Sequence, residues 1–466
     1  MGYLYLLATL LFVLGIKRLT SVRTCTQGNR LSETGMFVAI AATLLINSGI
    51  ISWWVVVAGL IVGGSIGAVI AKRTPTTQMP EMVAALNGFG GVASALVAMA
   101  AILEDPIMHD ASRALCDTGT VNAISIPATI LIGMVTLAGS FVAFFKLGGK
   151  KLVHPLNGAA RHWLHGALGL SAVLWAIWMV YTHSAVGLTL ATILLTLTAA
   201  ALGILLVLPI GGADMPVVVS LLNSYSGLAG AAAGFVIMNP LLIVAGALVG
   251  TSGLILTRIM CKAMNRSLGN VLLGGIGDDS VAADAKEYKS IKSTTPEEVA
   301  MLLDGASSVI FVPGYGLAVA QAQHVIRELG DLLIQRGVQV RYAIHPVAGR
   351  MPGHMNVLLA ESDVSYDLLW EMDRINGDFK NTDVVIVVGA NDVVNPAARE
   401  GTGPIAGMPI LDVDQARTCI VIKRSLSPGY AGIRNPLFDM PNTLMVFQDA
   451  KQALEGMVKE VKELGK

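Results

Sequence analysis

The hydrophobic and polar positions divide this chain into two halves of different character. From the N-terminus to about Met260, long apolar runs rich in Gly and Ala are separated by short polar segments. A helix that spans a bilayer needs roughly 17–25 mostly apolar residues. We therefore expect nine transmembrane helices, at about 2–18, 34–50, 52–71, 81–102, 122–145, 163–182, 185–208, 216–237 and 239–261.

After Asp278 the pattern changes to short apolar runs separated by charged, amphipathic segments. Helical periodicity covers 317–336, and a hydroxyl, a proline and two carboxylates between Ser293 and Glu298 indicate a helix start. Runs of β-branched and other apolar residues predict strands, at 308–312, 338–344, 383–389, 409–413, 419–422 and 444–447. Strands that alternate with helices are typical of a parallel, doubly wound α/β sheet, so we expect a Rossmann-like domain.

Composition agrees with a chain divided between lipid and water. Of the 466 residues, 54% are hydrophobic and 14% are charged, against about 25% charged in soluble proteins. The segment 266–290 is rich in glycine and mixed charge, which is typical of a linker. We therefore expect a membrane domain over 1–265, a linker over 266–290 and an α/β domain over 291–466.

Charge and cysteine content exclude some classes of function. The formal net charge is zero, so no overall field favours nucleic acid. The four cysteines are scattered without a C-x-x-C pair and are expected to be free structural thiols. The first apolar run lacks a positive start and an A-x-A site, so we expect a retained helix rather than a cleaved signal peptide.

Basic residues gather in alternate loops of the apolar half. They follow the first, third, fifth and ninth predicted helices, whereas the loop 103–121 is acidic. The positive-inside rule then places the N-terminus outside and the C-terminal half in the cytoplasm. An odd number of spans agrees with this orientation.

Three polar residues of the apolar half are candidates for function. Asn87 and Asn223 fall inside predicted helices, where an unpaired amide is costly. They either join helices by hydrogen bonds or belong to a hydrated ion path, and the sequence leaves both open. Asp214, two residues before Pro216, fits a helix N-cap. The T-V-G-Y-G filter of a potassium pore is missing from the sequence.

The α/β half carries a glycine turn directly after its first predicted strand. Pro313-Gly-Tyr-Gly316 precedes a helical pattern, and glycines let a backbone approach a pyrophosphate closely. The third glycine position of the dinucleotide fingerprint holds Val319 instead. Asp392 and Lys423 also follow predicted strands, and ligands of parallel sheets bind at those carboxyl ends.

The choice of nucleotide depends on two further positions. An NAD site usually carries a carboxylate after its second strand, and the segment 345–350 has none. Lys423, Arg424 and Ser425 offer two cations and a hydroxyl, which suit a 2′-phosphate. A solvated basic pair is the alternative, but the two observations together favour NADP(H).

At these residues the chain resembles the β-subunit family of the proton-translocating NAD(P) transhydrogenases. The resemblance covers essentially the whole chain and is carried by five segments, 211–227, 313–323, 345–361, 388–397 and 423–432. It implies NADP(H) on this chain and NAD(H) on a partner α subunit that adds further transmembrane helices. It also implies an AB-specific, direct hydride transfer between the two nicotinamides, with no catalytic side chain and no metal.

The resemblance implies coupling and location as well. Hydride transfer would be linked to proton passage through the membrane domain, so that NADPH is formed. The assembled unit would be a dimer in a bacterial inner membrane. Asn87, Asp214 and Asn223 would belong to the proton path. The expected cofactor-binding residues are Gly314, Tyr315, Gly316, Ala318, Val319, Arg350, Gly389, Asn391, Asp392, Lys423, Arg424, Ser425, Gly429, Tyr430 and Ala431.

Asn87 departs from the family pattern. Members often carry a histidine in the fourth helix, and asparagine cannot carry a proton there, so we expect the titrating group in a partner subunit. The competing function is a nucleotide-sensing transporter or channel with a regulatory NADP-binding domain. It would need an ion or substrate pathway motif, and the sequence shows none. The nucleotide motifs also disfavour a purely structural membrane scaffold.

Overall fold

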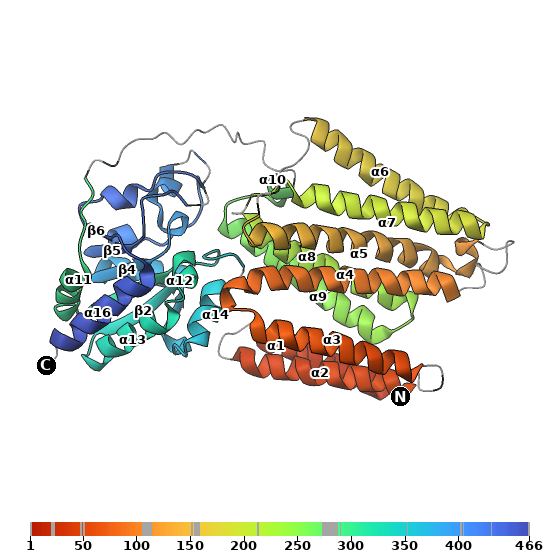
Figure 1. Cartoon of the computed structure of the whole chain (residues 1–466), viewed down its shortest axis with the longest axis horizontal. Coiled ribbons are helices and arrows are strands. Elements are labelled where there is room, and N and C mark those ends of the chain that lie inside the picture. The colour runs from red at the N-terminus through yellow and green to blue at the C-terminus, as the bar shows by residue number, and fades with distance from the viewer. Residues whose placement is uncertain are drawn as a thin grey trace. The chain divides into compact units, whose positions relative to one another are not determined.

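The computed structural model describes most of the chain as two compact units, drawn in Figure 1. One unit is Met1–Ile210 with Val218–Thr257, and the other is Gly211–Val217 with Arg258–Lys466. The predicted domain boundaries at 265 and 291 remain a prediction, and 273–287 and 289 of the predicted linker lie outside the described residues. The described residues are 2–19, 24–46, 49, 52–104, 114–150, 152, 159–211, 214–272, 288, 290–351, 353–400, 403, 405–429 and 431–464.

Each predicted apolar run falls on a long helix. Seven helices of the described residues, α3 to α9, are long and apolar enough to cross a membrane, so the chain is an integral membrane protein. The second helix begins at Cys25 rather than near residue 34. The helices are α1 (Gly2–Leu19), α2 (Cys25–Ile46), α3 (Trp53–Arg73), α4 (Met79–Glu104), α5 (Thr120–Leu147), α6 (Ala159–Tyr181), α7 (Ala185–Val207), α8 (Met215–Val236) and α9 (Pro240–Ala263).

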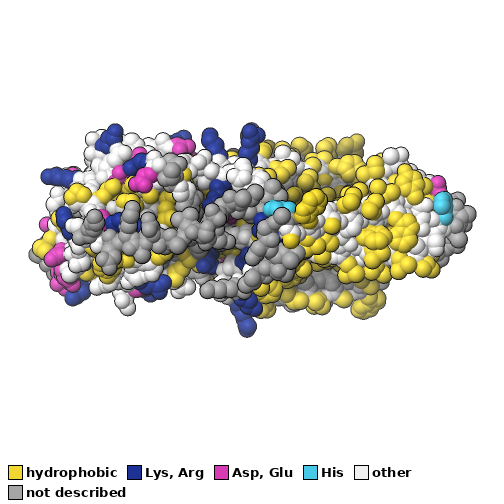
Figure 2. Space-filling view, turned by 90° about the horizontal axis from the view of Figure 1, so that it is seen from above, with side chains coloured by type: hydrophobic (Ala, Val, Ile, Leu, Met, Phe, Trp, Pro, Cys, Tyr) yellow, Lys and Arg dark blue, Asp and Glu magenta, His cyan; other side chains and the backbone are white. Residues whose placement is uncertain are grey.

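Glycine lets these helices approach closely. A Cβ added at Gly91 of α4 would lie 2.6 Å from the carbonyl oxygen of Gly133 on α5. A Cβ at Gly203 of α7 would lie 2.4 Å from the carbonyl oxygen of Val135. Small residues at helix contacts are the usual means of packing in lipid. Figure 2 shows the hydrophobic side chains gathered over the helical part and the charged ones over the sheet part.

The C-terminal part is built on one parallel sheet of six strands, in the order β3-β2-β1-β4-β5-β6. The central strands are buried on both faces, which explains their unbroken apolar sequences. The strands are β1 (Ser308–Pro313), β2 (Gln339–Ile344), β3 (Leu369–Glu371), β4 (Val384–Val388), β5 (Thr418–Ile422) and β6 (Thr443–Val446).

Different layers cover the two faces of the sheet. Helices α11 (Pro296–Asp304), α13 (Gln323–Gln335), α14 (His354–Glu361) and α16 (Ala450–Leu464) pack on one face, around Phe311 and Ile386. Short segments cover the other face, among them α15 (Met372–Ile375), η7 (Asn376–Asn381), η9 (Pro396–Glu400), η10 (Val413–Gln415) and η11 (Pro436–Asp439). Because β1, β4 and β5 are parallel, the loops that follow them emerge at the same edge of the sheet.

Some predictions hold, two need correction, and one strand was not predicted. Thr295 caps α11 by accepting the N–H of Glu298, as the sequence indicates. The predicted strand 409–413 is wrong, because that run is buried by side-chain packing without pairing into the sheet. The single helix predicted over 317–336 is two, α12 (Tyr315–Val319) and α13, with Gln321 at a φ of 50° between them. Strand β3 was not predicted, since it is three residues long and half-exposed.

Candidate functional site

The turn after β1 is locked against the turn after β4. The N–H of Gly314 donates to the carbonyl of Val388 at 2.9 Å, and that of Gly316 donates to Gly389 at 2.9 Å. A Cβ at Gly314 would lie 2.5 Å from the Ala390 backbone, and one at Gly316 would lie 2.6 Å from the Cα of Gly389. Glycine is required here by contact between two loops. Gly389 also has a φ of 66°, which favours glycine.

The side chains that follow the glycine turn differ in exposure. Ala318 is fully buried in the core beneath β1, whereas Val319 is 45% exposed. Ala318 therefore fills the close helix-to-sheet contact that the third glycine serves in a dinucleotide fingerprint. Val319 faces solvent and has no packing role of that kind.

The predicted phosphate-binding residues follow β5. Lys423 is half-buried, and its Nζ donates to the carbonyl of Ser427. Burial lowers the pKa of Lys423, and the nearby Asp392 carboxylate acts in the opposite direction. Arg424 and Ser425 are exposed, and the Ser425 hydroxyl lies 2.9 Å from that of Ser427. Three residues with cationic or hydroxyl groups therefore stand together at one strand end.

Asp392 holds the loop that comes after this strand. Its Oδ2 accepts the N–H of Ala431 at 3.1 Å. A Cβ at Gly429 would lie 2.4 Å from Oδ1 of the same carboxylate. The structure thus brings Asp392, Gly429 and Ala431 together. Tyr430 lies outside the described residues.

Two buried asparagines tie the same loops together. Asn435 is fully buried, and its Nδ2 donates to the backbone carbonyl of Asn391 at 3.1 Å and to the Asn391 Oδ1 at 3.0 Å. Asn395, also fully buried, donates to the carbonyl of Arg434 at 3.1 Å. The Nδ2 of Asn391 is buried and has no hydrogen-bond partner among the described residues.

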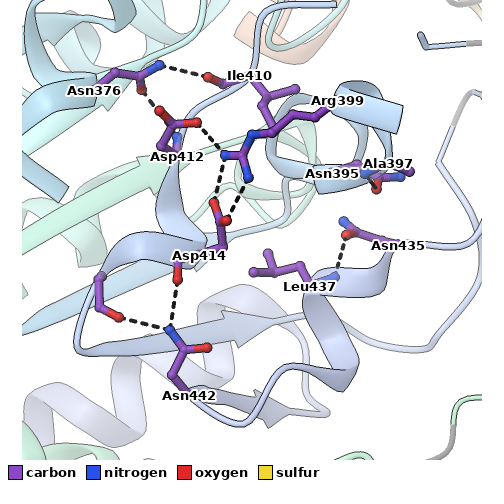
Figure 3. Close-up of polar contacts among 11 residues, drawn as sticks. Asn376, Asn395, Ala397, Arg399, Ile410, Asp412, Asp414, Asn435, Leu437 and Asn442 are labelled. Carbon is purple, nitrogen blue, oxygen red and sulfur yellow. Dashed lines mark hydrogen bonds and ion pairs between the residues drawn. The ribbon is translucent and has the colours of Figure 1, made fainter. Parts of the chain in front are cut away.

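Figure 3 shows the hydrogen bonds and ion pairs that hold the neighbouring segment 410–414 in place. Arg399 bonds to Asp414 at 2.7 and 2.9 Å and also pairs with Asp412. Asn376 donates to the carbonyl of Ile410 at 2.9 Å and accepts the N–H of Asp412 at 3.2 Å. These bonds fix the stretch that the sequence wrongly predicts as a strand.

Arg350 lies over the glycine turn through Tyr315. Its guanidinium carbon is 4.3 Å from the centroid of the Tyr315 ring, a cation–π contact. Its backbone N–H donates to Nδ1 of His354 at 3.1 Å. Arg350, in the loop after β2, therefore contacts Tyr315, the residue that follows Gly314 in the turn after β1.

His345 fixes the start of the same loop. Its Nδ1 accepts the N–H of Val347 at 3.2 Å, so Nε2 carries the proton and donates to the carbonyl of Pro409 at 2.8 Å. Burial lowers the pKa of His345 to about 4. This histidine is neutral and structural at ordinary pH.

In the helical part, the two candidate amides lie differently. Asn87 is 6% exposed, and its Nδ2 donates to the carbonyl of Val219 on α8 at 3.2 Å. Asn223 lies one turn after Val219 and is half-buried. Ser220 and Ser224, beside it on α8, donate to backbone carbonyls of α9 at 3.2 and 2.6 Å. Each of these donors bonds to the backbone of a neighbouring helix.

Asp214 lies just before α8 and forms an ion pair, while its role as a helix N-cap stays a prediction. Its Oδ2 lies 3.0 Å from Arg266 NH1, and the residue is 8% exposed. Its Oδ1 is buried and has no hydrogen-bond partner among the described residues. Burial raises the pKa of Asp214, and the Arg266 charge opposes that shift.

Comparison with known proteins matches this chain along nearly its full length. The family model described as NAD(P) transhydrogenase beta subunit matches residues 1–460. The chain belongs to this β-subunit family. It is similar to two proteins named NAD(P) transhydrogenase subunit beta, from Rhodospirillum rubrum and from a named strain of that species. Each is 47% identical over 458 residues, covering 97% of both chains.

A transhydrogenase β subunit requires an α subunit as its partner, and a nicotinamide nucleotide as its ligand. Sequence reasoning found the strand-end residues but missed His354, Asn395 and Asn435. An Asn before a Pro, as in Asn435-Pro436, is a helix-cap signal, and Asn435 does accept the N–H of Leu437. Nothing in the local sequence indicates the partners of His354.

Proposed function

We propose that this chain is the membrane-spanning, NADP(H)-binding subunit of a proton-translocating, AB-specific transhydrogenase. NAD(H) would bind on the α subunit, which adds further transmembrane helices, and the assembled unit would be a dimer. Membership of the β-subunit family is the observation that carries the proposal. The strand order β3-β2-β1-β4-β5-β6 supports a doubly wound, Rossmann-like fold over 291–466, because dinucleotide-binding sheets use that order.

The proposed NADP(H) site lies at the carboxyl ends of β1, β4 and β5. Gly314 and Gly316 let the turn after β1 pack directly on Gly389 and Ala390 of the turn after β4, and the backbone of these two turns would bind the pyrophosphate. Lys423, Arg424 and Ser425 would hold the 2′-phosphate. The buried Nδ2 of Asn391, which has no partner among the described residues, is a donor available to the nucleotide.

When bound, NADP(H) would supply the hydride donor or acceptor, and the residues of this chain would position it. Arg350 would contact the nucleotide from above Tyr315, and the exposed side chain of Val319 would contact it from the first turn after β1. Asp392 accepts the N–H of Ala431 and would thereby hold Gly429 and Ala431 beside the ligand, and Tyr430 stays a predicted cofactor-binding residue. Exclusion of water and alignment of the two nicotinamides can account for much of such a rate enhancement.

Coupling to the membrane would involve Asn87, Asp214 and Asn223. We propose nine spans over 1–265, an outside N-terminus and a cytoplasmic α/β domain in a bacterial plasma membrane. The contact between Asp214 and Arg266 supports a charge-sensitive link between the start of α8 and the segment after α9. One proton crossing about 150–200 mV can supply roughly 3.5–4.5 kcal/mol, enough to favour NADPH formation.

The deciding experiment is calorimetry on the purified full chain with NADPH and with NADH. We expect NADPH to bind far more tightly, and Arg424→Ala to weaken NADPH binding by about 1.5–3 kcal/mol without changing the NADH affinity. Equal affinities for the two nucleotides would contradict the assignment of NADP(H) to this chain.

A further inference from the structure

His354 is a fully buried, titratable residue to which the proposed function gives no role. It begins α14 and has an exposed fraction of 0%. Its ring lies directly under the preceding turn, where Gly349 has a φ of 107°. A Cβ at Gly349 would lie 2.5 Å from Nδ1 of His354. The ring therefore supports the backbone from which Arg350 extends.

The hydrogen bond from Arg350 determines the form of this ring. The N–H of Arg350 donates to Nδ1 at 3.1 Å, and only a deprotonated ring nitrogen can accept. The proton of the neutral ring is then on Nε2. Burial, assisted by the Arg350 charge, lowers the pKa of His354 to about 4. The ring is therefore a neutral acceptor across the physiological range.

His354 differs from the other buried histidine of this loop. His345 bonds through both ring nitrogens, as a purely structural histidine does. The Nε2 of His354 is buried and has no partner among the described residues. A buried donor without an acceptor is costly, so packing alone does not explain a histidine here, since an apolar ring would avoid that cost.

The contacts of Arg350 indicate a function for the His354 ring. His354 holds the Arg350 backbone, while the Tyr315 ring lies 4.3 Å beneath the Arg350 guanidinium. The rings of Tyr315 and His354 are 6.2 Å apart. Tyr315 follows Gly314, so these contacts join the loop after β2 to the glycine turn after β1.

We propose that His354 is a positioning residue, whose Nδ1 fixes the Arg350 backbone so that the guanidinium stays over Tyr315, ready for an anionic group of the nucleotide. The inference rests on the proposed function. His354 would act on nucleotide binding through Arg350, without contacting the nucleotide itself, and this role needs the neutral ring with its proton on Nε2.

The test compares substitutions of His354 in the purified full chain, with NADPH affinity measured by calorimetry. His354→Phe keeps a ring but removes the acceptor, and we expect it to weaken NADPH binding about tenfold. His354→Asn supplies an amide oxygen as acceptor, and we expect affinity within about threefold of the wild type. The control is His324→Phe, since His324 is exposed on α13 and should leave affinity unchanged.

A double substitution shows whether the effect runs through Arg350. In an Arg350→Ala background, His354→Phe should cause no further loss of NADPH affinity. Full additivity, equal losses for His354→Phe and His354→Asn, or wild-type affinity in His354→Phe would each overturn the proposal.

A measurement on the wild type avoids variants that fail to fold. Nitrogen-15 NMR of histidine-labelled full chain, with His354→Asn used to assign the signal, should show His354 with a bare Nδ1 and a protonated Nε2 at neutral pH. A protonated Nδ1 would overturn the proposal. Failure of the wild type to prefer NADPH would instead end the proposed function, and leave the tautomer result to be judged separately.

Discussion

Buried asparagines form different kinds of hydrogen bond in the helical part and in the sheet part of this molecule. In the helices, Asn87 donates to a main-chain carbonyl of the neighbouring α8, and the serines of α8 do the same toward α9. In the sheet part, Asn395 and Asn435 join one loop to another beyond the strand ends. Polar groups inside a bilayer have no water to bond to and must find partners within the protein, whereas those at a sheet edge can fix the shape of a binding site.

Titratable groups follow the same division. The sheet part buries two neutral histidines, His345 and His354, and both have a pKa lowered to about 4. Near the helices, Asp214 is buried and paired with Arg266. Protonation of the two histidines at acid pH would therefore destabilise the sheet part. Protonation of Asp214 would instead weaken its ion pair with Arg266 at the start of α8.

The largest expected effect is the acid sensitivity of the sheet part. Both histidines are neutral in the folded state and have an ordinary pKa of 6.5 when unfolded. Their stabilising contribution is complete above pH 6.5 and is lost as pH falls toward 4. The slope of unfolding free energy should approach about 2.7 kcal/mol per pH unit within that window, measured by urea unfolding of the segment 290–466.

Single substitutions sharpen this expectation. His345→Gln should remove about half of the slope, and the exposed His324→Gln should leave the slope unchanged. A pH-independent unfolding free energy between pH 4 and 6.5 would show that these rings titrate normally.

The next effect concerns the ion pair before α8. Asp214→Asn keeps the shape and any capping role but removes the charge, so we expect proton-linked transhydrogenation in reconstituted vesicles to fall by about tenfold or more. NADPH binding by the same variant should be unchanged.

The control for this charge removal is Asp117→Asn. Asp117 accepts the N–H of Ala114 at 2.8 Å in a loop cap and has no proposed role in coupling. If Asp214→Asn retains full coupled turnover, Asp214 serves only as a structural residue.

A smaller effect is expected at the contact between the two glycine turns. Gly314→Ala would place a Cβ against the Ala390 backbone, so we expect a loss of roughly 1–3 kcal/mol in unfolding free energy together with weaker NADPH binding. Gly377→Ala is the matched control, because nothing lies within 4 Å of a Cβ there. Equal stability of the two variants would mean that the loops can separate freely.

The smallest effect is expected at Arg399. Its pairs with Asp412 and Asp414 are partly exposed, and exposed ion pairs contribute only about 0–1 kcal/mol. Arg399→Gln should therefore shift the urea midpoint slightly and leave NADPH affinity intact. A loss of unfolding free energy well above this range would show that the ion pairs of Arg399 with Asp412 and Asp414 contribute substantially to the stability of the fold.

The sequence predicts what local pattern determines. Apolar runs long enough to cross a bilayer coincide with helices, and strands buried on both faces, such as β1 and β4, are visible as apolar runs. The run 409–413 has the same local signature but packs without pairing, and that difference depends on the rest of the domain. Strand β3 is too short and too exposed to leave a signal.

Parts of the candidate site could not be predicted because their partners are distant in the chain. Asp214 and Arg266 are 52 positions apart, and Asn391 and Asn435 are 44 apart. The glycine turn was predicted from its spacing, but its contact with Gly389 was not. Only the fold shows that these glycines are required by one another.

That mutual requirement has a genetic consequence. Gly314 and Gly316 meet Gly389 and Ala390 backbone to backbone, and no residue is smaller than glycine. A side chain gained at Gly316 therefore cannot be offset by trimming Gly389, the residue it would strike. A search for second-site suppressors of a Gly316 substitution should therefore return changes elsewhere in the domain and none at Gly389.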